Sequence, residues 1–211
     1  MTVQIKRPPR VIRTTPPLTL LPATDWPEPG QWTYNDYLRL PDDGNRYEVI
    51  KGNLYMTPSP SLDHQRVSAE LEYGLMHFVK QNQLGLVLDA PFDVTLPEIA
   101  TPVQPDILFV RQARIQEIVT PKQIVGAPDL VLEIISPGSA RYDRFTKYAA
   151  YEEAGVPEFW LVDVAHMTIE VYVLENGKYQ PFGKWGIGDV AESHVLPGWR
   201  VALAEIFAPL A

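Results

Sequence analysis

Three apolar runs constrain the fold of this chain most strongly, at residues 107–110, 130–135 and 158–162. Their length and their content of Val, Ile, Leu and Phe are typical of strands that are buried on both faces of a sheet. A segment of helical length, residues 140–154, separates the second run from the third and ends at Gly155, a common helix-stop residue. Strand, helix and strand in this order predict an α/β fold with a central mixed sheet flanked by helices.

The longest predicted helix covers residues 62–81, where Val67, Leu71 and Leu75 recur at helical spacing. Asn-Gly within Glu175-Asn176-Gly177 is a strong turn signal and predicts a C-terminal hairpin. The other expected elements are a short helix over 34–40, a hairpin of 46–50 and 54–57, strands over 85–94, 103–111, 169–174 and 178–182, a helical turn over 114–118 and a loop over 97–102.

Composition excludes several classes of protein. The chain has 211 residues and no Cys, which excludes disulfide frameworks, thiolate zinc sites and cysteine nucleophiles. No apolar run approaches the roughly 18 residues of a membrane span, so no membrane partner is expected. The first residues lack the apolar core of a secretory signal, and we therefore expect a cytoplasmic protein.

Charge and proline divide the chain into two expected parts, a proline-rich basic arm over residues 1–30 and a domain over residues 31–211. Seven prolines lie between Pro8 and Pro29, and this stretch lacks the periodic apolar residues of a packed segment. A solvated tail is the simpler interpretation of the arm, and contact with phosphates or a partner subunit is the alternative. The chain carries 18 bases and 26 acids, a net charge of −8, which argues against broad nucleic-acid affinity. The first 24 residues contain four bases and no acid, namely Lys6, Arg7, Arg10 and Arg13.

Two carboxylates occur where the sequence predicts buried strands. Glu133 lies in the middle of the apolar run 130–135, and Asp106 follows Pro105 at the start of the preceding run. A buried carboxylate needs a cationic partner, because burying it unpaired costs several kcal/mol. Carboxylates at one end of neighbouring strands can hold Mg²⁺, whereas the absence of Cys and of clustered His disfavours zinc. Pairing with a core arginine is the alternative. Asp143 and Lys147, four residues apart on the next predicted helix, read as an ordinary ion pair.

The order of these motifs resembles the restriction-endonuclease-like proteins that are abundant in cyanobacteria and belong to the PD-(D/E)XK nuclease superfamily. The resemblance spans about residues 31–208 and leaves the proline-rich arm outside. The motifs that carry it are the Tyr47–Met56 hairpin, Pro58-Ser59-Pro60, His64, Pro105-Asp106, Glu133-Ile134-Ile135-Ser136-Pro137, Asp143 with Lys147 and Tyr151, and Gly155–Asp163.

This resemblance implies a restriction-endonuclease-like core with an additional N-terminal helix and hairpin and a C-terminal hairpin. It implies that Asp106 and Glu133 hold Mg²⁺, which Mn²⁺ can replace, with the backbone carbonyl of Ile134 as a further ligand. The usual motif has Lys two residues after the Glu, but that position is Ile135 here. The resemblance points instead to Lys147. Glu48 and His64 match positions near the site, as proton shuttles or orienting groups.

The implied activity is metal-dependent endonucleolytic hydrolysis of DNA phosphodiester bonds, in a protein that on base rates is a two-fold homodimer. Three alternatives stay open. The first is a catalytically inactive nuclease fold that acts as a nucleic-acid-binding or interaction module, and the second is a hydrolase for a small phosphoester. The third is an interaction module whose proline-rich arm docks on a partner.

Overall fold

The computed structural model describes residues 26–41, 43–57, 59–135, 139 and 141–208, so that most of the predicted proline-rich arm lies outside the described residues. Among the described helices, none combines the length and the apolar character needed to cross a membrane. In chain order the elements are α1 (Tyr34–Tyr37), β1 (Arg46–Ile50), β2 (Asn53–Thr57), α2 (Leu62–Gln81), β3 (Gly85–Asp89), β4 (Asp93–Leu96), β5 (Ala100–Val103), β6 (Ile107–Arg111), η2 (Gln112–Arg114), α3 (Ile115–Ile118), β7 (Gln123–Val125), β8 (Leu130–Ile135), η3 (Tyr142–Lys147), α4 (Tyr148–Ala154), β9 (Glu158–Asp163), β10 (Thr168–Glu175), β11 (Lys178–Trp185), β12 (Val190–Glu192), β13 (Arg200–Ala202) and α5 (Leu203–Ile206).

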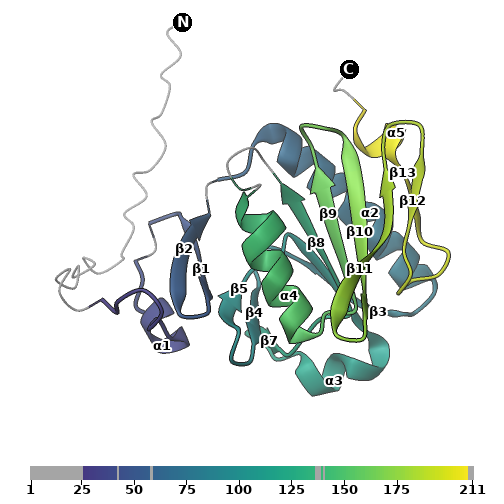
Figure 1. The fold of residues 1–211 in the computed structure, drawn as a ribbon. Coiled ribbons are helices and arrows are strands. Elements are labelled where there is room, and N and C mark those ends of the chain that lie inside the picture. The colour runs from purple at the N-terminus through teal and green to yellow at the C-terminus, as the bar shows by residue number, and fades with distance from the viewer. Residues whose placement is uncertain (1–25, 42, 58, 136–138, 140, 209–211) are drawn as a thin grey trace, which may run out of the picture.

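The fold is α/β, as the sequence predicts, and is built around a mixed six-stranded sheet in the order β11-β10-β9-β8-β6-β3 (Figure 1). Strands β8 and β9 are parallel, and the segment that contains α4 connects them, whereas their outer neighbours pair antiparallel. A second, five-stranded sheet has the order β2-β1-β5-β4-β7 and contains the predicted N-terminal hairpin. The C-terminal hairpin is also present, as β10 and β11.

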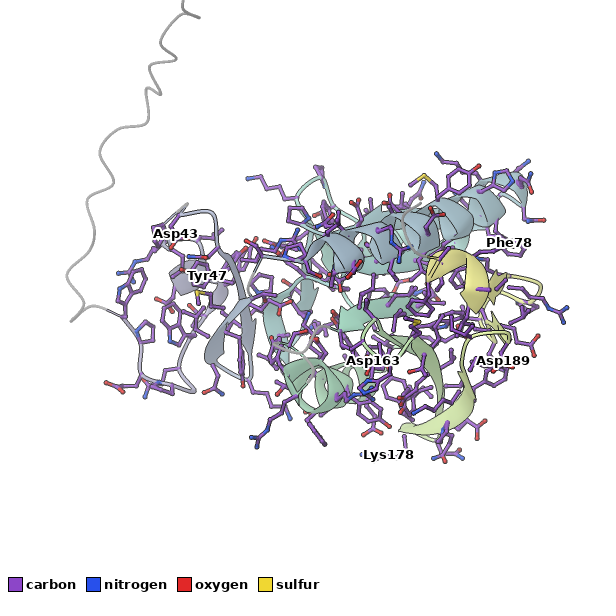
Figure 2. The ribbon with its side chains drawn as sticks, turned by 90° about the horizontal axis from the view of Figure 1, so that it is seen from above. Asp43, Tyr47, Phe78, Asp163, Lys178 and Asp189 are labelled. Atoms are coloured by element: carbon purple, nitrogen blue, oxygen red, sulfur yellow. The ribbon has the colours of Figure 1, made fainter. Side chains whose placement is uncertain are left out.

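Two helices cover the two faces of the six-stranded sheet. Seen from above, α2 runs along one face and α4 along the other (Figure 2). Every residue of β8 is buried, and its side chains alternate between the two layers. Leu132 packs in the core beneath α2, whereas Val131 and Ile135 pack in the core beneath α4. Glu133 shares the second face with Val131 and Ile135, and therefore points toward the segment that follows β8.

Several element boundaries differ from the prediction. The segment 85–94 forms two strands, β3 and β4, on either side of Ala90-Pro91, and β6 begins at Ile107 rather than at residue 103. Strand β5 begins within the expected loop over 97–102 and ends at Val103, although Pro102 argues against a strand there. Pairing of β5 with β4 uses Ala100 and Val103, the residues on either side of the Thr101-Pro102 pair, so the missing proline amide is not needed.

The helix predicted over 140–154 is not a regular α-helix in its first part. Residues Tyr142–Lys147 form a π-helical segment, η3, which continues into α4 and ends at Gly155 in the left-handed conformation. Asp143 and Lys147 are the buried residues of this segment. π-Helical turns are rare and often occur at functional sites. This one directs an acid and a lysine into the protein interior.

Candidate active site

Glu133 is a buried carboxylate at the centre of the six-stranded sheet, and two groups from the next helix contact it. Lys147 Nζ lies 3.0 Å from Oε1 and 2.9 Å from Oε2 of Glu133. The hydroxyl of Tyr151 donates a hydrogen bond of 2.6 Å to Oε1. Lys147 and Tyr151 are four residues apart, so both project from the same side of the helical segment. The cationic partner that Glu133 requires is therefore this lysine.

Lys147 is itself buried, with only 3 % of its surface exposed, and it also contacts Glu48 of β1. The distance from its Nζ to Glu48 Oε1 is 3.1 Å, and that to Asp143 Oδ1 is 3.9 Å. Glu48 is fixed in turn by the hydroxyl of Tyr142 at 2.9 Å and by the backbone N–H of Gln104 at 2.7 Å. These bonds hold the lysine between carboxylates from two different sheets.

Asp106 lies just before β6, beside the end of β8. Its Oδ2 accepts a hydrogen bond of 2.8 Å from the backbone N–H of Ile134, in continuation of the pairing between β6 and β8. The same oxygen lies 3.2 Å from Nε2 of His64 in the first turn of α2. Ser61 caps this helix by accepting the His64 amide, which fixes the position of the imidazole relative to Asp106.

All five predicted catalytic residues line one cavity of about 30 Å³, a volume sufficient for an ion or a water molecule. Ile134, the predicted third metal ligand, lines it as well, although only its N–H is seen in a hydrogen bond to the site. The complete lining consists of Arg46, Glu48, Thr57, His64, Gln104, Asp106, Glu133, Ile134, Ser139, Asp143 and Lys147.

Negative charge exceeds positive charge around this cavity. Burial raises the pKa of Glu133 well above its usual value, although Lys147 opposes the shift. Burial likewise raises the pKa of Asp143 to about 6. Burial also works to raise the pKa of Asp106, but the hydrogen bond and the charge of His64 outweigh it and leave this pKa lowered. Burial acts to lower the pKa of Lys147. The negative charges of Glu133 and the other acids outweigh this effect and raise that pKa well above its usual range. Two basic residues of the lining, Arg46 and Lys147, thus face four carboxylates.

Comparison with known proteins identifies the family. The sequence profile of the Uma2 family, described as "Putative restriction endonuclease", matches residues 34–204. The chain belongs to the Uma2 family. A crystal structure described as a "putative nuclease belonging to DUF820", from Anabaena variabilis, superposes with a TM-score of 0.68 at 20 % sequence identity. The match covers 83 % of this chain and 97 % of that one, so the two share a fold. Among curated proteins, no sequence matches.

The residues of this Uma2 protein fit a divalent cation of the Mg²⁺ type. Within the described residues, no group of three or more His, Asp or Glu side chains is arranged to hold a metal ion by itself, as a zinc site would require. Mg²⁺ instead keeps several waters and uses one or two carboxylates, which matches Asp106 and Glu133. In the part of the chain that the structure describes, the Nδ1 atom of His64 and the Oε1 atom of Gln104 are buried and have no hydrogen-bond partner. Both residues line the cavity, so water bound to a cation there would find acceptors.

Sequence reasoning missed several groups of this site in the Uma2 chain. Tyr151 entered only as part of the family motif, and in the structure it packs in the core while its hydroxyl binds Glu133. Tyr142 and Gln104 were not singled out, and both hold Glu48. The signal for Tyr151 was its position four residues after Lys147. Gln104 carried a weaker signal, since it stands two residues before Asp106.

Asp143→Asn is expected to stabilise the metal-free protein at pH 8 by about 1–3 kcal/mol, and to change its stability little at pH 4. The pKa of Asp143 is raised to about 6 by burial, so its proton stabilises the folded state at low pH and is lost as the pH rises through 6. Asparagine cannot ionise, so the stability of the variant does not fall in this way as the pH rises. Urea denaturation in EDTA at pH 4, 6 and 8 measures the effect, with the exposed Glu175→Gln as control. A difference that is the same at all three pH values would contradict it.

Proposed function

We propose that this Uma2 protein is a metal-dependent endonuclease that hydrolyses phosphodiester bonds of DNA, with Mg²⁺ as its cation and Mn²⁺ as a substitute. The observation that carries the proposal is the buried ion pair of Glu133 and Lys147, at 2.9–3.0 Å, on the wall of a cavity that Asp106 also lines. Two acids that could hold a metal ion and a lysine that could stabilise charge on a phosphate suit phosphodiester hydrolysis with a metal ion. Membership of a family described as "Putative restriction endonuclease" supports the same activity.

Asp106 and Glu133 are the residues that would hold the cation, with the carbonyl of Ile134 as a further ligand. When bound, Mg²⁺ lowers the pKa of a coordinated water and neutralises charge on the phosphate. His64 orients Asp106 through its Nε2 and lines the same cavity, and its Nδ1 has no hydrogen-bond partner within the described residues.

Lys147 supplies the fixed positive charge of the proposed site. A preorganised cation stabilises the negative charge that develops on a phosphate during hydrolysis, because it needs no reorientation. Glu48 and Tyr151 act as positioning residues, since Glu48 holds Lys147 and Tyr151 holds Glu133. This arrangement replaces the strand lysine that the usual motif has at the position of Ile135.

The test is nicking of supercoiled plasmid by the purified protein in Mg²⁺, Mn²⁺ or EDTA. We expect cleavage with either metal and none in EDTA. Glu133→Gln and Asp106→Asn are expected to cleave at least about 100-fold more slowly, because each removes charge from the cation site. Glu117→Gln, an exposed acid on α3, is the matched control and is expected to cleave like the wild type. Cleavage by Asp106→Asn at the wild-type rate would overturn the assignment.

Metal binding gives a second readout that does not depend on activity. At a free Mn²⁺ concentration 100 times its dissociation constant, bound ion adds about 2.7 kcal/mol to the stability of the wild type, and the Asp106→Asn variant should lose this gain. Metal binding without cleavage of supercoiled, linear or single-stranded DNA would favour a small phosphoester as substrate. Neither metal binding nor cleavage would favour an inactive nuclease fold that binds nucleic acid or a partner.

A further inference from the structure

We propose that a second cavity, beside the cation site, binds an unstacked base of the DNA strand that is cut, so that single-stranded DNA is the preferred substrate form. The inference deepens the proposed nuclease function and rests on it. This cavity, which we term the aromatic pocket, has a volume of about 570 Å³, within the usual range for ligand pockets. Its lining comes from β2 and from the start of the helical segment after β8, namely Tyr55, Met56, Thr57, Ser139, Arg141, Tyr142, Phe145 and Thr146.

The aromatic pocket adjoins the cation cavity directly. Thr57 and Ser139 line both cavities, so they share a wall. Tyr142 connects them chemically, because its ring lines the aromatic pocket while its hydroxyl donates to Glu48. A strand whose phosphate occupies the cation site would therefore place a neighbouring base at the mouth of the aromatic pocket.

The side chains of the pocket suit the flat face of a base. The rings of Tyr55 and Tyr142 pack at a centroid distance of 4.6 Å and an angle of 34°. Phe145 and Met56 expose 69 % and 62 % of their surface, which is unusual for large apolar side chains. Bases stack on such side chains without regard to sequence, since every base has a π-face.

Positive charge at the aromatic pocket and the cation cavity suits a short length of phosphate backbone. Arg141 lines the aromatic pocket and Arg46 lines the cation cavity, and neither forms an ion pair within the described part of the chain. Arg144, in contrast, is neutralised by Asp163 and Glu170. Two unpaired arginines on a chain of net charge −8 favour contact with a few phosphates rather than with a long duplex.

A duplex would have to unstack a base before that base could enter the aromatic pocket. This step costs a few kcal/mol for a paired base and least for a strand that is already single. The aromatic pocket therefore favours single-stranded over double-stranded DNA, since a base in a single strand can unstack from its neighbours. We expect the wild type to bind a single-stranded oligonucleotide more tightly than a duplex of the same length.

The test is fluorescence anisotropy in EDTA, with labelled oligothymidylate of eight nucleotides and an abasic strand of equal length as probes. Both probes carry the same phosphates, so their difference in affinity measures the contribution of the bases. We expect the wild type to prefer the thymidylate by about 5- to 100-fold. Phe145→Ala should abolish this preference, whereas Tyr73→Ala, a change of similarly exposed aromatic surface on α2, should keep it.

Arg141→Gln separates backbone contact from base contact. This variant should weaken binding of both probes equally and reduce the salt dependence of binding by about one phosphate contact. Equal affinity of the wild type for the two probes, or for single strand and duplex, would overturn the proposal, as would an unchanged preference in Phe145→Ala. Because binding is measured without metal, these outcomes are distinct from a failure of cleavage, which bears on the proposed nuclease function.

Discussion

Lys147→Met is expected to lower the free energy of unfolding at pH 7 by about 3–5 kcal/mol. Methionine fills a similar volume, but the buried carboxylates of Glu133 and Glu48 lose the cation that lies 2.9 and 3.1 Å from them. Removing one partner of a buried ion pair leaves uncompensated charge in a medium of low dielectric constant, which costs more than the pair itself contributes. Urea denaturation at pH 7 measures the effect.

The destabilisation of Lys147→Met should shrink as the pH falls. Without the lysine, the positive charge that opposes the effect of burial is lost and the pKa of Glu133 rises further, so the folded variant takes up a proton there and its stability recovers toward low pH. Lys178→Met is the control, because Lys178 is exposed and solvent screens its ion pair with Glu152. A loss in Lys147→Met that is no larger than the control, or that is unchanged at pH 4, would contradict the expected result.

Glu158→Gln is expected to cost about 2–5 kcal/mol although the two side chains have the same shape. Glu158 is fully buried at the start of β9. Its Oε1 accepts hydrogen bonds from Trp160 Nε1 at 2.6 Å and Ser193 Oγ at 2.7 Å. Its Oε2 accepts from the backbone N–H groups of His194 and Val195 at 2.8 and 2.6 Å. An amide has only one acceptor oxygen, so one pair of donors would face an NH₂ group.

Two measurements check this result. Urea denaturation gives the loss in stability, and amide hydrogen exchange of His194 and Val195 shows whether the segment that they fix opens in the variant. Glu205→Gln is the control, since Glu205 is exposed in the nearby C-terminal helix and should change stability by less than about 0.5 kcal/mol. Wild-type protection of both amides in Glu158→Gln would show that the carboxylate does not hold this segment.

The sequence predicts the fold class well because its strongest signals are local. An apolar run such as Leu130–Ile135 needs no partner to be read as a buried strand, and Glu133 is conspicuous there for the same reason. Strand β5 was missed because Pro102 is a local argument against a strand, whereas the place of β5 in the sheet depends also on pairing with the distant β1. Pairing between segments far apart in the chain leaves no periodic signature in either one.

The partners of Lys147 are harder to predict from residues alone. Asp143 and Lys147 have the spacing of a surface ion pair on an α-helix, but their side chains are 3.9 Å apart and buried. The π-helical segment Tyr142–Lys147 breaks the 3.6-residue period on which the surface interpretation rests. Only the resemblance to a nuclease family pointed to this lysine. Its contact with Glu48 of β1 depends on the docking of the second sheet, which no local pattern reports.

Because Lys147 lies on a helical segment and not on a strand, the residues of the site belong to two separate parts of the fold. Glu133 lies in β8, which pairs with a strand on each side, and Asp106 lies just before β6, where its backbone carbonyl accepts a hydrogen bond from Ala90. Lys147 and Tyr151 arrive on one short helical segment, and side-chain packing holds that segment in place. Were η3 and α4 to shift away from the sheet, Glu133 would lose both partners at once while the two acids stayed in place. The charged centre therefore forms only when this helical segment packs against the sheet. The position of the segment determines the site as much as the residues that the segment carries.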